Sequence, residues 1–399
     1  MKETKRQNII KSLQETKEKR KTQKCLVFEL KINYSKLNKV QKETLKMFFV
    51  EAKWLYNFYL STDDIFNQSD KIEKVIIKDK DKKDIEKKLQ YLPAQVKQTI
   101  LKQLKQNVYN LSRAKKKNNK VGKLKFKSEI NSIDFNQYGN THRIINNNLF
   151  KIGRIKKYIK VHGLNQIKPE YEIANAKLIK KASGYYIKLT CFENLNSKDF
   201  NFINNKKGDV GIDFGIKDNI VTSDGEFFNI KIQEDEHLKR LQRKFARQKK
   251  GSKNFYKTKQ KIKRCYEKIS NKKQDQVNKL VNYLCTSYTS IYMQDENLKG
   301  WHLGLFGKQV QHSALGSIKQ KLFKQKNVII INRFEPTTKL CHECGAINKD
   351  IKLSDRIFKC ACGYEEHRDI KSAKTIRFIG RFKNNYIPTE HRDFKPVEK

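Results

Sequence analysis

The chain contains no run of 18 or more apolar residues, and this absence excludes a transmembrane helix. Its opening residues, 1–6, are polar and lack the apolar core of a secretory signal. The sequence therefore predicts a protein that stays in the cytoplasm.

Acidic residues are scarce, because 42 Asp and Glu face 88 Lys and Arg and leave a net charge of +46. A protein this basic repels itself unless a polyanion neutralises it, so its composition favours nucleic acid as the partner. The alternatives are a cationic surface that serves only solubility, or one that binds an anionic membrane. The charge is spread over the whole chain rather than over one amphipathic helix, which argues against a membrane.

Half of the eight cysteines have no close partner in the sequence, namely Cys25, Cys191, Cys265 and Cys285. These four lie in apolar-periodic stretches, where we expect reduced, buried thiols that pack as small hydrophobic groups.

The other four cysteines form two close pairs, Cys341-x-x-Cys344 and Cys360-x-Cys362, which 15 residues separate. Four thiolates on two tight turns can close a tetrahedron around Zn²⁺ and leave no open position for water. The spacing therefore predicts a structural zinc knuckle.

The first half of the chain predicts a mixture of helices and strands. Residues 1–24 are basic without lasting periodicity, which indicates an arm, and residues 61–90 are charge-dense and poorly patterned. Apolar spacing predicts helices over 45–59 and 96–111, and alternation predicts strands at 25–32, 149–152, 158–161, 176–179 and 185–192. We expect these strands to form a small antiparallel barrel that a helical insert interrupts, a fold suited to nucleic-acid backbones.

A basic cluster follows the second helix, with eight cations among residues 113–127. Such a cluster is often a solvated face, but the global charge makes a track for phosphates an equal alternative. The candidate nucleic-acid contacts are Arg113, Lys115, Lys116, Lys117, Lys120 and Lys123.

The second half predicts a three-stranded meander at 209–214, 219–223 and 226–230. Two basic helical segments with a break at Gly251-Ser252 come next. A helix at 277–288, a strand at 291–294, a helix at 310–322, a strand at 328–331, the knuckle and a last helix from Asp369 follow. This is the order of elements in an RNase H-like fold.

Two aspartates suggest a metal-dependent phosphodiester site, which needs carboxylates that converge on ions about 3.5–4 Å apart. Asp213 lies between Ile212 and Phe214 in an apolar strand, where a carboxylate requires a charge partner. Asp369 opens the last helix. The structural alternatives are a turn-capping role for Asp213 and an N-cap role for Asp369.

The middle acid of such a site falls in the segment Gln294-Asp295-Glu296. If the strand continues, Gln294 and Glu296 point to one face and Asp295 to the other. We favour Glu296 and keep Asp295 as its rival.

Five segments of the second half together resemble the TnpB family, whose members are transposon-encoded proteins related to compact type V CRISPR effectors. The segments are Gly211-Ile-Asp-Phe-Gly-Ile-Lys, Gln294-Asp-Glu-Asn-Leu-Lys-Gly-Trp, Phe334-Glu-Pro-Thr-Thr-Lys-Leu-Cys-His-Glu-Cys-Gly, Phe358-Lys-Cys-Ala-Cys-Gly and His367-Arg-Asp-Ile-Lys-Ser-Ala-Lys-Thr-Ile. The resemblance is specific over 208–378. It is softer over 25–200, where Leu92-Pro-Ala-Gln95 before a helix looks similar to the family.

The resemblance implies an α+β multidomain protein, with an oligonucleotide-binding-like wedge barrel, a helical recognition insert, and an RNase H-like RuvC domain that carries a zinc ribbon. The implied domains are a basic arm (1–24), a wedge barrel (25–35 and 134–205), a recognition domain (36–133), a RuvC-like nuclease domain (206–334 and 367–380), a zinc ribbon (335–366) and a tail (381–399).

The resemblance also implies an RNA-guided DNA endonuclease that acts as a monomeric ribonucleoprotein, in a prokaryotic host and at the nucleoid. A guide RNA would supply sequence specificity by base pairing, and the protein would read a short motif beside the target in double-stranded DNA. Asp213, Glu296 and Asp369 would bind Mg²⁺, and Cys341, Cys344, Cys360 and Cys362 would bind zinc.

Three motifs depart from the commonest family pattern. The middle motif usually begins with Glu, which is Gln294 here, and the last motif usually reads Asp-Arg-Asp-x-Asn, where this chain has His367 and Lys371. The second cysteine pair is Cys-x-Cys rather than Cys-x-x-Cys.

Three other functions compete with the endonuclease. A nuclease-inactive, RNA-guided repressor would be marked by loss of the acids, yet Asp213 and Asp369 are both present. A DNA-strand transposase would need a catalytic tyrosine motif with paired histidines on a strand, which the chain lacks. A zinc-ribbon adaptor would explain the cysteines but not the acids.

Overall fold

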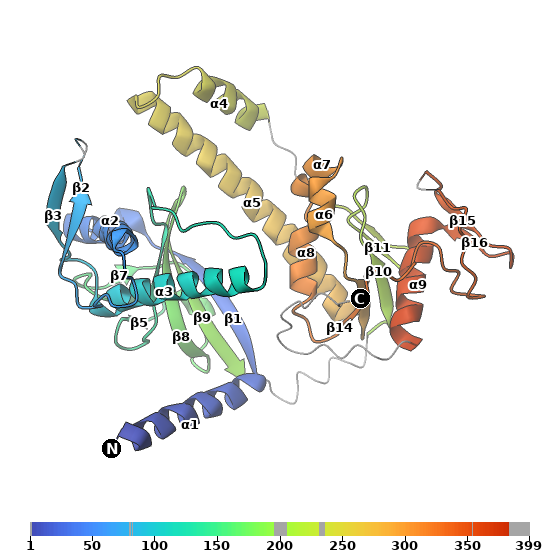
Figure 1. Cartoon of the computed structure of the whole chain (residues 1–399), viewed down its shortest axis with the longest axis horizontal. Coiled ribbons are helices and arrows are strands. Elements are labelled where there is room, and N and C mark those ends of the chain that lie inside the picture. Colours follow the sequence, from blue (N-terminus) through green and yellow to red (C-terminus); the bar gives the residue numbers. More distant parts are fainter. Residues whose placement is uncertain are drawn as a thin grey trace. The chain divides into compact units, whose positions relative to one another are not determined.

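The computed structural model describes residues 2–79, 81, 83–194, 206–230, 236–352 and 354–382 (Figure 1). The chain divides into two compact units, Met1–Asn196 and Ser197–Lys399, each with its own core. Parts of the expected wedge barrel (195–205) and of the tail (383–399) lie outside the described residues.

The basic N-terminal segment forms a helix, α1 (Lys2–Lys21), and not the irregular arm that its lack of periodicity predicted. Tertiary contacts hold the end of this helix, since the guanidinium of Arg20 pairs with Glu172 at 2.7 Å and stacks over the Phe192 ring at 3.5 Å. Such contacts with residues far along the chain leave no mark in the local pattern.

The strands of the first unit form separate sheets, and no closed barrel is found within its described residues, so that part of the prediction is wrong. The larger sheet has the antiparallel order β1-β9-β8-β4, and its strands are β1 (Gln23–Lys31), β9 (Gly184–Asn194), β8 (Glu172–Lys181) and β4 (Ser132–Phe135). A three-stranded sheet contains β5 (His142–Ile144), β6 (Leu149–Ile152) and β7 (Ile159–Lys160).

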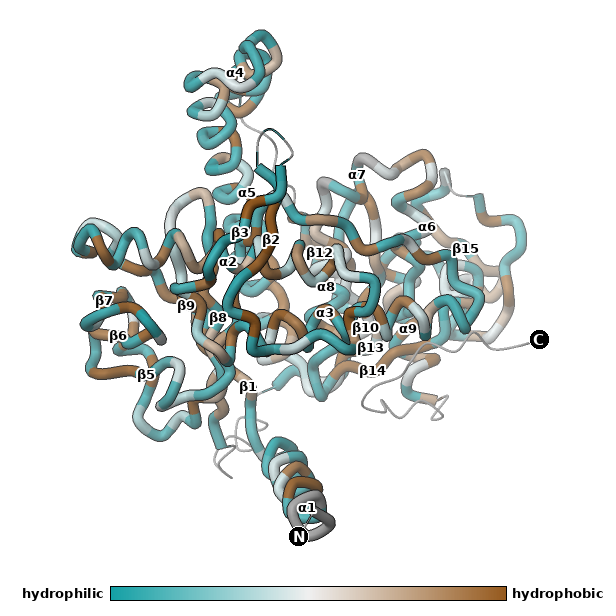
Figure 2. Tube along the Cα trace, turned by 60° about the vertical axis from the view of Figure 1, so that its left-hand side comes forward, coloured by the Kyte–Doolittle hydropathy of each residue, from teal (hydrophilic) through white to brown (hydrophobic). Residues whose placement is uncertain are grey.

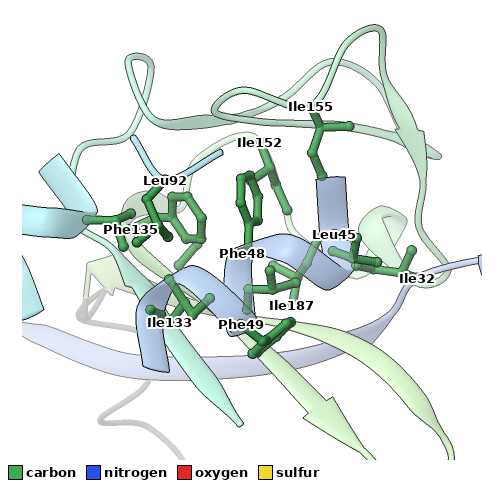
Figure 3. Packing of buried hydrophobic residues seen from close by; sticks show 14 of the residues in the cluster. Ile32, Leu45, Phe48, Phe49, Leu92, Ile133, Phe135, Ile152, Ile155 and Ile187 are labelled. Carbon is green, nitrogen blue, oxygen red and sulfur yellow. The ribbon is translucent and has the colours of Figure 1, made fainter. Parts of the chain in front are cut away.

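The core of the first unit is built around a helix. Helix α2 (Lys39–Ser61) places Leu45, Phe48 and Phe49 among residues of both sheets in one apolar cluster (Figure 3). The rings of Phe48 and of Phe135 on β4 lie 6.2 Å apart. The two sheets therefore share one core with the helix. An isolated bridge between Ile32 and Val161 also connects them.

The second helix of the first unit that the sequence predicted is α3 (Ala94–Lys116). Buried Glu51 on α2 accepts hydrogen bonds from the backbone N–H groups of Gln90, Tyr91 and Leu92 at 2.8–2.9 Å, which positions the turn before α3.

The charge-dense segment at 61–90 forms a hairpin that the sequence did not predict, with β2 (Lys74–Lys78) and β3 (Asp84–Lys88). Short 3-10 turns lie at Tyr34–Lys36 and Leu164–Gln166.

The second unit contains a five-stranded mixed sheet in the order β12-β11-β10-β13-β14. Its strands are β12 (Phe227–Phe228), β11 (Ile220–Thr222), β10 (Val210–Asp213), β13 (Ile291–Gln294) and β14 (Val328–Ile331). The first three form an antiparallel meander, and β13 and β14 run parallel to β10. The predicted succession of meander, helix, strand, helix, strand and helix is present.

Helices cover both faces of this sheet. On one face, α5 (Lys253–Ser287) and α8 (Leu315–Leu322) share an apolar cluster with Ile212 and Met293. On the other face, α9 (Arg368–Phe382) lies so close that a Cβ on Gly211 would meet the backbone oxygen of Ala373 at 1.9 Å. Glycine at position 211 therefore permits the contact that brings the start of α9 to the end of β10.

Two helical boundaries differ from the predicted ones. The predicted helix at 277–288 and the basic segment before it are one helix of 35 residues, α5, which follows α4 (Glu236–Ala246) after the break at Gly251-Ser252. The predicted helix at 310–322 is divided into α7 (Gly307–His312) and α8, and α6 (Leu298–Leu303) precedes them. A small hairpin, β15 (Ile357–Lys359) and β16 (Glu365–His367), leads into α9.

No helix among the described residues is both long and apolar enough to cross a bilayer.

Candidate metal centre and acidic site

The four paired cysteines come together at two glycine turns. The N–H of Gly345 donates to the oxygen of Cys341 at 2.9 Å, and the N–H of Gly363 donates to that of Cys360 at 3.0 Å. Both glycines adopt a positive φ, 76° and 91°, which a residue with a Cβ reaches only with strain. The Cys-x-x-Cys pair thus lies in a turn closed between residues four positions apart, and the Cys-x-Cys pair in one closed between residues three positions apart.

The sulfur atoms have the spacing of a tetrahedral metal site, since all four lie within 4.8 Å of one another. The Cys341–Cys362 and Cys344–Cys360 Sγ distances are 3.9 and 3.5 Å, whereas a disulfide would need about 2.05 Å. Zinc–sulfur bonds of about 2.3 Å give tetrahedron edges of roughly 3.8 Å. The donor set and its spacing therefore fit a structural zinc ion.

Asp213 lies at the end of β10, on the face of the sheet that α9 covers. Burial, with the negative charges of Glu296 and Asp369 added to it, raises the pKa of Asp213 to about 8. The backbone N–H of Phe214 and the charge of Arg368 oppose this rise only in part. The charges of Glu296 and Asp369, two of the acids proposed from sequence, thus act on Asp213.

Asp295 lies on the face of the sheet that α5 and α8 cover. Met293 packs with α5 and α8, and Asp295, two residues further on, binds Lys319 of α8 at 2.6 Å and also binds Arg333. Burial alone would raise the pKa of Asp295, but hydrogen bonds from Lys319 and Arg333 lower it overall. This carboxylate is therefore already neutralised by protein cations.

Glu296 follows the end of β13, and its negative charge acts on Asp213. Tyr292 lies on the α9 side of the sheet, because a Cβ on Gly380 of α9 would meet its ring, and strand alternation carries the same side to Gln294, where β13 ends. Burial raises the pKa of Glu296, against the charges of Lys319 and Arg333. Among the described residues, no side chain donates a hydrogen bond to the carboxylate of Glu296.

Gln294 takes a structural role at the position where the family usually has Glu. Its amide nitrogen donates to the backbone oxygens of Asn332, Arg333 and Glu335 at 2.9–3.1 Å, and its amide oxygen accepts from Thr337 at 2.9 Å. A glutamate there would turn an acceptor toward three carbonyl oxygens, which is repulsive. Sequence alone did not reveal this network, because its partners lie some forty residues away.

Asp369 lies in the first turn of α9, beside Arg368, whose Nε is 3.4 Å from its carboxylate. The three acids are less tightly gathered than the cysteines, which form the one group of metal-binding side chains within 4.8 Å in the described part of the chain. The acids come from β10, from the segment after β13, and from α9.

Lys371, where the family usually has Asn, is fully buried. Its ammonium donates to the backbone oxygens of Thr337 and Thr338 at 3.0 and 2.8 Å and lies 3.9 Å from the centre of the Phe358 ring. Burial lowers the pKa of Lys371 to about 8, although the charges of Cys341, Cys360 and Asp213 act in the opposite direction. Nothing in the local sequence pattern predicted this burial.

The predicted basic cluster and the acids belong to different units. Its six candidate residues are exposed at the end of α3 and in the segment that follows, and they are Arg113, Lys115, Lys116, Lys117, Lys120 and Lys123.

A second basic surface, which sequence analysis did not select as a candidate site, lies in the second unit on α4 and the first half of α5. Residues 236–273 carry 16 Lys and Arg and only 2 acids. Stacked rings of Phe245 and Phe255, 4.4 Å apart, hold the two helices together. Figure 2 shows α4 largely in the hydrophilic colours. The density of cations over 239–273 was the signal that would have identified this surface.

Known proteins resemble this chain mainly in the second unit. The model of a family described as "Probable transposase" (OrfB_IS605) matches residues 203–300, and that of the "Cas12f1-like, TNB domain" matches residues 317–376. The first match covers Asp213 and Glu296, and the second covers the four cysteines and Asp369.

Two curated relatives have related names. A Streptomyces pristinaespiralis protein, "Putative RNA-guided DNA endonuclease", is 27% identical over 184 residues, 43% of this chain and 45% of that protein. An Escherichia coli K12 protein, "Putative RNA-guided DNA endonuclease InsQ", is 25% identical over 197 residues, 43% of this chain and 48% of that protein. The chain thus spans about half the length of the curated relatives it matches. The resemblance to the TnpB family that the motifs indicated is confirmed.

Proposed function

We propose that this protein is an RNA-guided DNA endonuclease, whose second unit is a RuvC-like nuclease domain with an inserted zinc ribbon. The observation that carries the proposal is the electrostatic coupling of Asp213 with Glu296 and Asp369, from three separate segments at one end of the sheet. The names of the relatives and the element order of an RNase H-like fold support it.

Asp213, Glu296 and Asp369 would hold Mg²⁺, because carboxylate oxygens are the ligands this ion prefers. The fit rests on burial and charge, since burial, with the charges of Glu296 and Asp369 added to it, raises the pKa of Asp213, and a divalent ion would offset both effects. When bound, the ion would polarise the scissile phosphate and lower the pKa of the attacking water.

The protein residues around the acids would orient this site. Lys319 and Arg333 hold Asp295 on the far face, which leaves Glu296 on the side of α9. Gln294 binds the 332–337 segment to the end of β13 through hydrogen bonds. These bonds would fix the end of the strand and so the position of Glu296, two residues later. The zinc ribbon would be structural and would anchor the start of α9.

The cationic surfaces would bind the nucleic-acid backbone. The basic cluster at 113–123 and the α4–α5 surface together offer phosphate contacts in both units, as a guide RNA and a DNA target require. We propose that the protein acts as a monomeric ribonucleoprotein in the cytoplasm of a prokaryotic cell, at the nucleoid, and reads a short motif beside its target. The finer domain boundaries given above are part of the same proposal.

The alternative is a nuclease-inactive, RNA-guided repressor, and Gln294 is the observation that favours it, because the usual acid is absent there. We propose that Glu296 supplies the carboxylate that position 294 lacks, and its charge acts on Asp213. The family description "Probable transposase" belongs to the matched model, and the acids argue for hydrolysis instead.

The test is to purify the full chain, sequence the RNA that remains bound, and assay Mg²⁺-dependent cleavage of DNA that matches the RNA. Cleavage that Asp213→Asn abolishes, while guided binding persists, supports the endonuclease. Guided binding by the native chain with no cleavage would support the repressor, and a chain without bound RNA would contradict both.

A further inference from the structure

We infer that Lys371 is a positioning residue that couples the zinc ribbon to the acidic site. The inference concerns the same site as the proposed nuclease function and rests on it for its consequence in catalysis. Its structural part, a link between zinc binding and the environment of one buried ammonium, stands on contacts alone.

The contacts of Lys371 join α9 to two parts of the ribbon. Its ammonium donates to the oxygens of Thr337 and Thr338, in the segment that enters the first cysteine turn. The same ammonium lies 3.9 Å from the centre of the Phe358 ring on β15, just before the second cysteine turn. One side chain thus holds the approaches to both turns.

Charge explains why an ammonium is tolerated in a fully buried position. The anionic groups that act on Lys371 are Cys341, Cys360 and Asp213, so it lies within electrostatic reach of both the thiolates and the acids. Four thiolates around one Zn²⁺ carry a net charge of about −2, and a nearby cation stabilises such an anionic group on its buried side, where Cys341 lies. Lys371 supplies that cation, with hydrogen bonds that also fix its position.

The place of Lys371 on α9 connects these contacts to the proposed chemistry. Asp369 precedes it by two residues in the same helical turn, so a movement of the ribbon that releases Thr337 and Phe358 also frees the start of α9. Loss of zinc should therefore reach the acidic site in part through Lys371.

A second tie between α9 and the ribbon provides a matched control. Lys374 pairs with Glu366 on β16 at 2.6 Å, but both side chains are partly exposed, 29% and 22%. Partly exposed pairs contribute little, whereas removal of a buried charged donor leaves two carbonyl oxygens unsatisfied.

The experiment compares zinc release from the full-length Lys371→Met and Lys374→Met variants after addition of a chelator. Lys371→Met should release zinc at least about tenfold faster than the native chain, and Lys374→Met within about threefold of it. In cleavage assays, Lys371→Met should also need more Mg²⁺ for half-maximal rate while its affinity for nucleic acid is unchanged. Equal zinc release and equal Mg²⁺ demand in the two variants would overturn the inference.

A measurement on the native chain does not depend on the folding of a variant or on nuclease activity. Amine labelling read by peptide mass spectrometry should find Lys371 protected in the zinc-loaded protein and reactive after chelation. Lys97, which is buried in the first unit and donates to the oxygen of Ile72 at 2.9 Å, should stay protected in both states. Lys371 that stays protected without zinc, or that reacts in its presence, would refute the coupling.

Discussion

The ammonium of Lys319 lies 2.6 Å from the carboxylate of Asp295 and 2.6 Å from the backbone oxygen of Glu296. One lysine thus neutralises the first acid and holds the backbone of the second. The negative charge of Glu296 adds to burial in raising the pKa of Asp213. The two adjacent acids therefore have different surroundings, and for this reason we propose Glu296 as the metal ligand.

The first prediction concerns these two acids. Glu296→Gln should reduce cleavage by several orders of magnitude, because a metal ligand is lost, while guided DNA binding persists. Asp295→Asn should retain appreciable activity, and any loss should appear mainly as lower stability, because Lys319 and Arg333 lose their partner. Single-turnover cleavage of a matched DNA measures both. The opposite result would make Asp295 the ligand, and no effect from either change would place the middle acid elsewhere.

The second prediction separates binding from cutting. Asp213→Ala and Asp369→Ala should each abolish cleavage and leave guided DNA binding intact, because the proposed nucleic-acid contacts lie on other surfaces. Asp213→Ala should in addition stabilise the metal-free protein above neutral pH, since it removes a buried charge that its neighbours repel. Thermal unfolding without Mg²⁺ measures this effect. Cleavage at the native rate by either variant would remove that residue from the site.

The third prediction concerns the four-thiolate centre. Cys341→Ser and Cys360→Ser should each lower the zinc content and the melting temperature, because structural zinc contributes about 10–16 kcal/mol in small peptides. Cys285→Ser, outside the centre, is the control and should keep its zinc. Elemental analysis of the purified variants gives the answer, and a full zinc complement in Cys360→Ser would show that fewer than four thiolates bind the ion.

The fourth prediction concerns the basic surfaces. The protein should purify with bound RNA, and log affinity should fall linearly with log salt, with a slope of roughly 0.9 per duplex phosphate contacted. Neutralising Lys257, Lys261 and Lys268, exposed on α5, should make this slope less negative without changing which RNA is bound. An unchanged slope would exclude α5 from the RNA interface.

The fifth prediction uses a buried histidine of the first unit. Burial lowers the pKa of His142 to about 4, so the folded unit holds a neutral ring while the unfolded chain takes up a proton near pH 6.5. Its contribution to stability is therefore complete above pH 6.5 and is lost as the pH falls toward 4. Between pH 7 and pH 5 the loss should be about 2 kcal/mol relative to His142→Phe.

Urea unfolding can measure this difference through Trp54, which packs in the first unit, in a background where Trp301 of the second unit is changed to Phe. If the native chain and His142→Phe lose stability equally between pH 7 and pH 5, the ring is already protonated or exposed in the folded state.

Local patterns predicted most of the fold. The spacing of Leu45, Phe48 and Phe49 gave helix α2, and the apolar strands at 149–152, 291–294 and 328–331 were placed at their observed bounds. The cysteine spacing gave the metal centre directly, since two tight turns are themselves local features.

Features that depend on distant partners could not be predicted. The meeting of the sheets around α2 depends on long-range packing, and the hairpin β2–β3 lies in a segment whose charges conceal its alternation. The burial of Lys371 and the amide network of Gln294 arise from residues some thirty to forty positions away. The same limit applies to Asp295, whose partners Lys319 and Arg333 lie 24 and 38 positions away.

The most direct test of the central claim is cleavage by the reconstituted complex when the guide segment of its RNA is exchanged. With Mg²⁺, the complex should cut only DNA that matches the new guide and carries the adjacent motif, and Asp213→Asn should bind that DNA without cutting it. Cleavage that ignores the guide, or cleavage that Asp213→Asn retains, would contradict an RNA-guided nuclease whose active site contains Asp213.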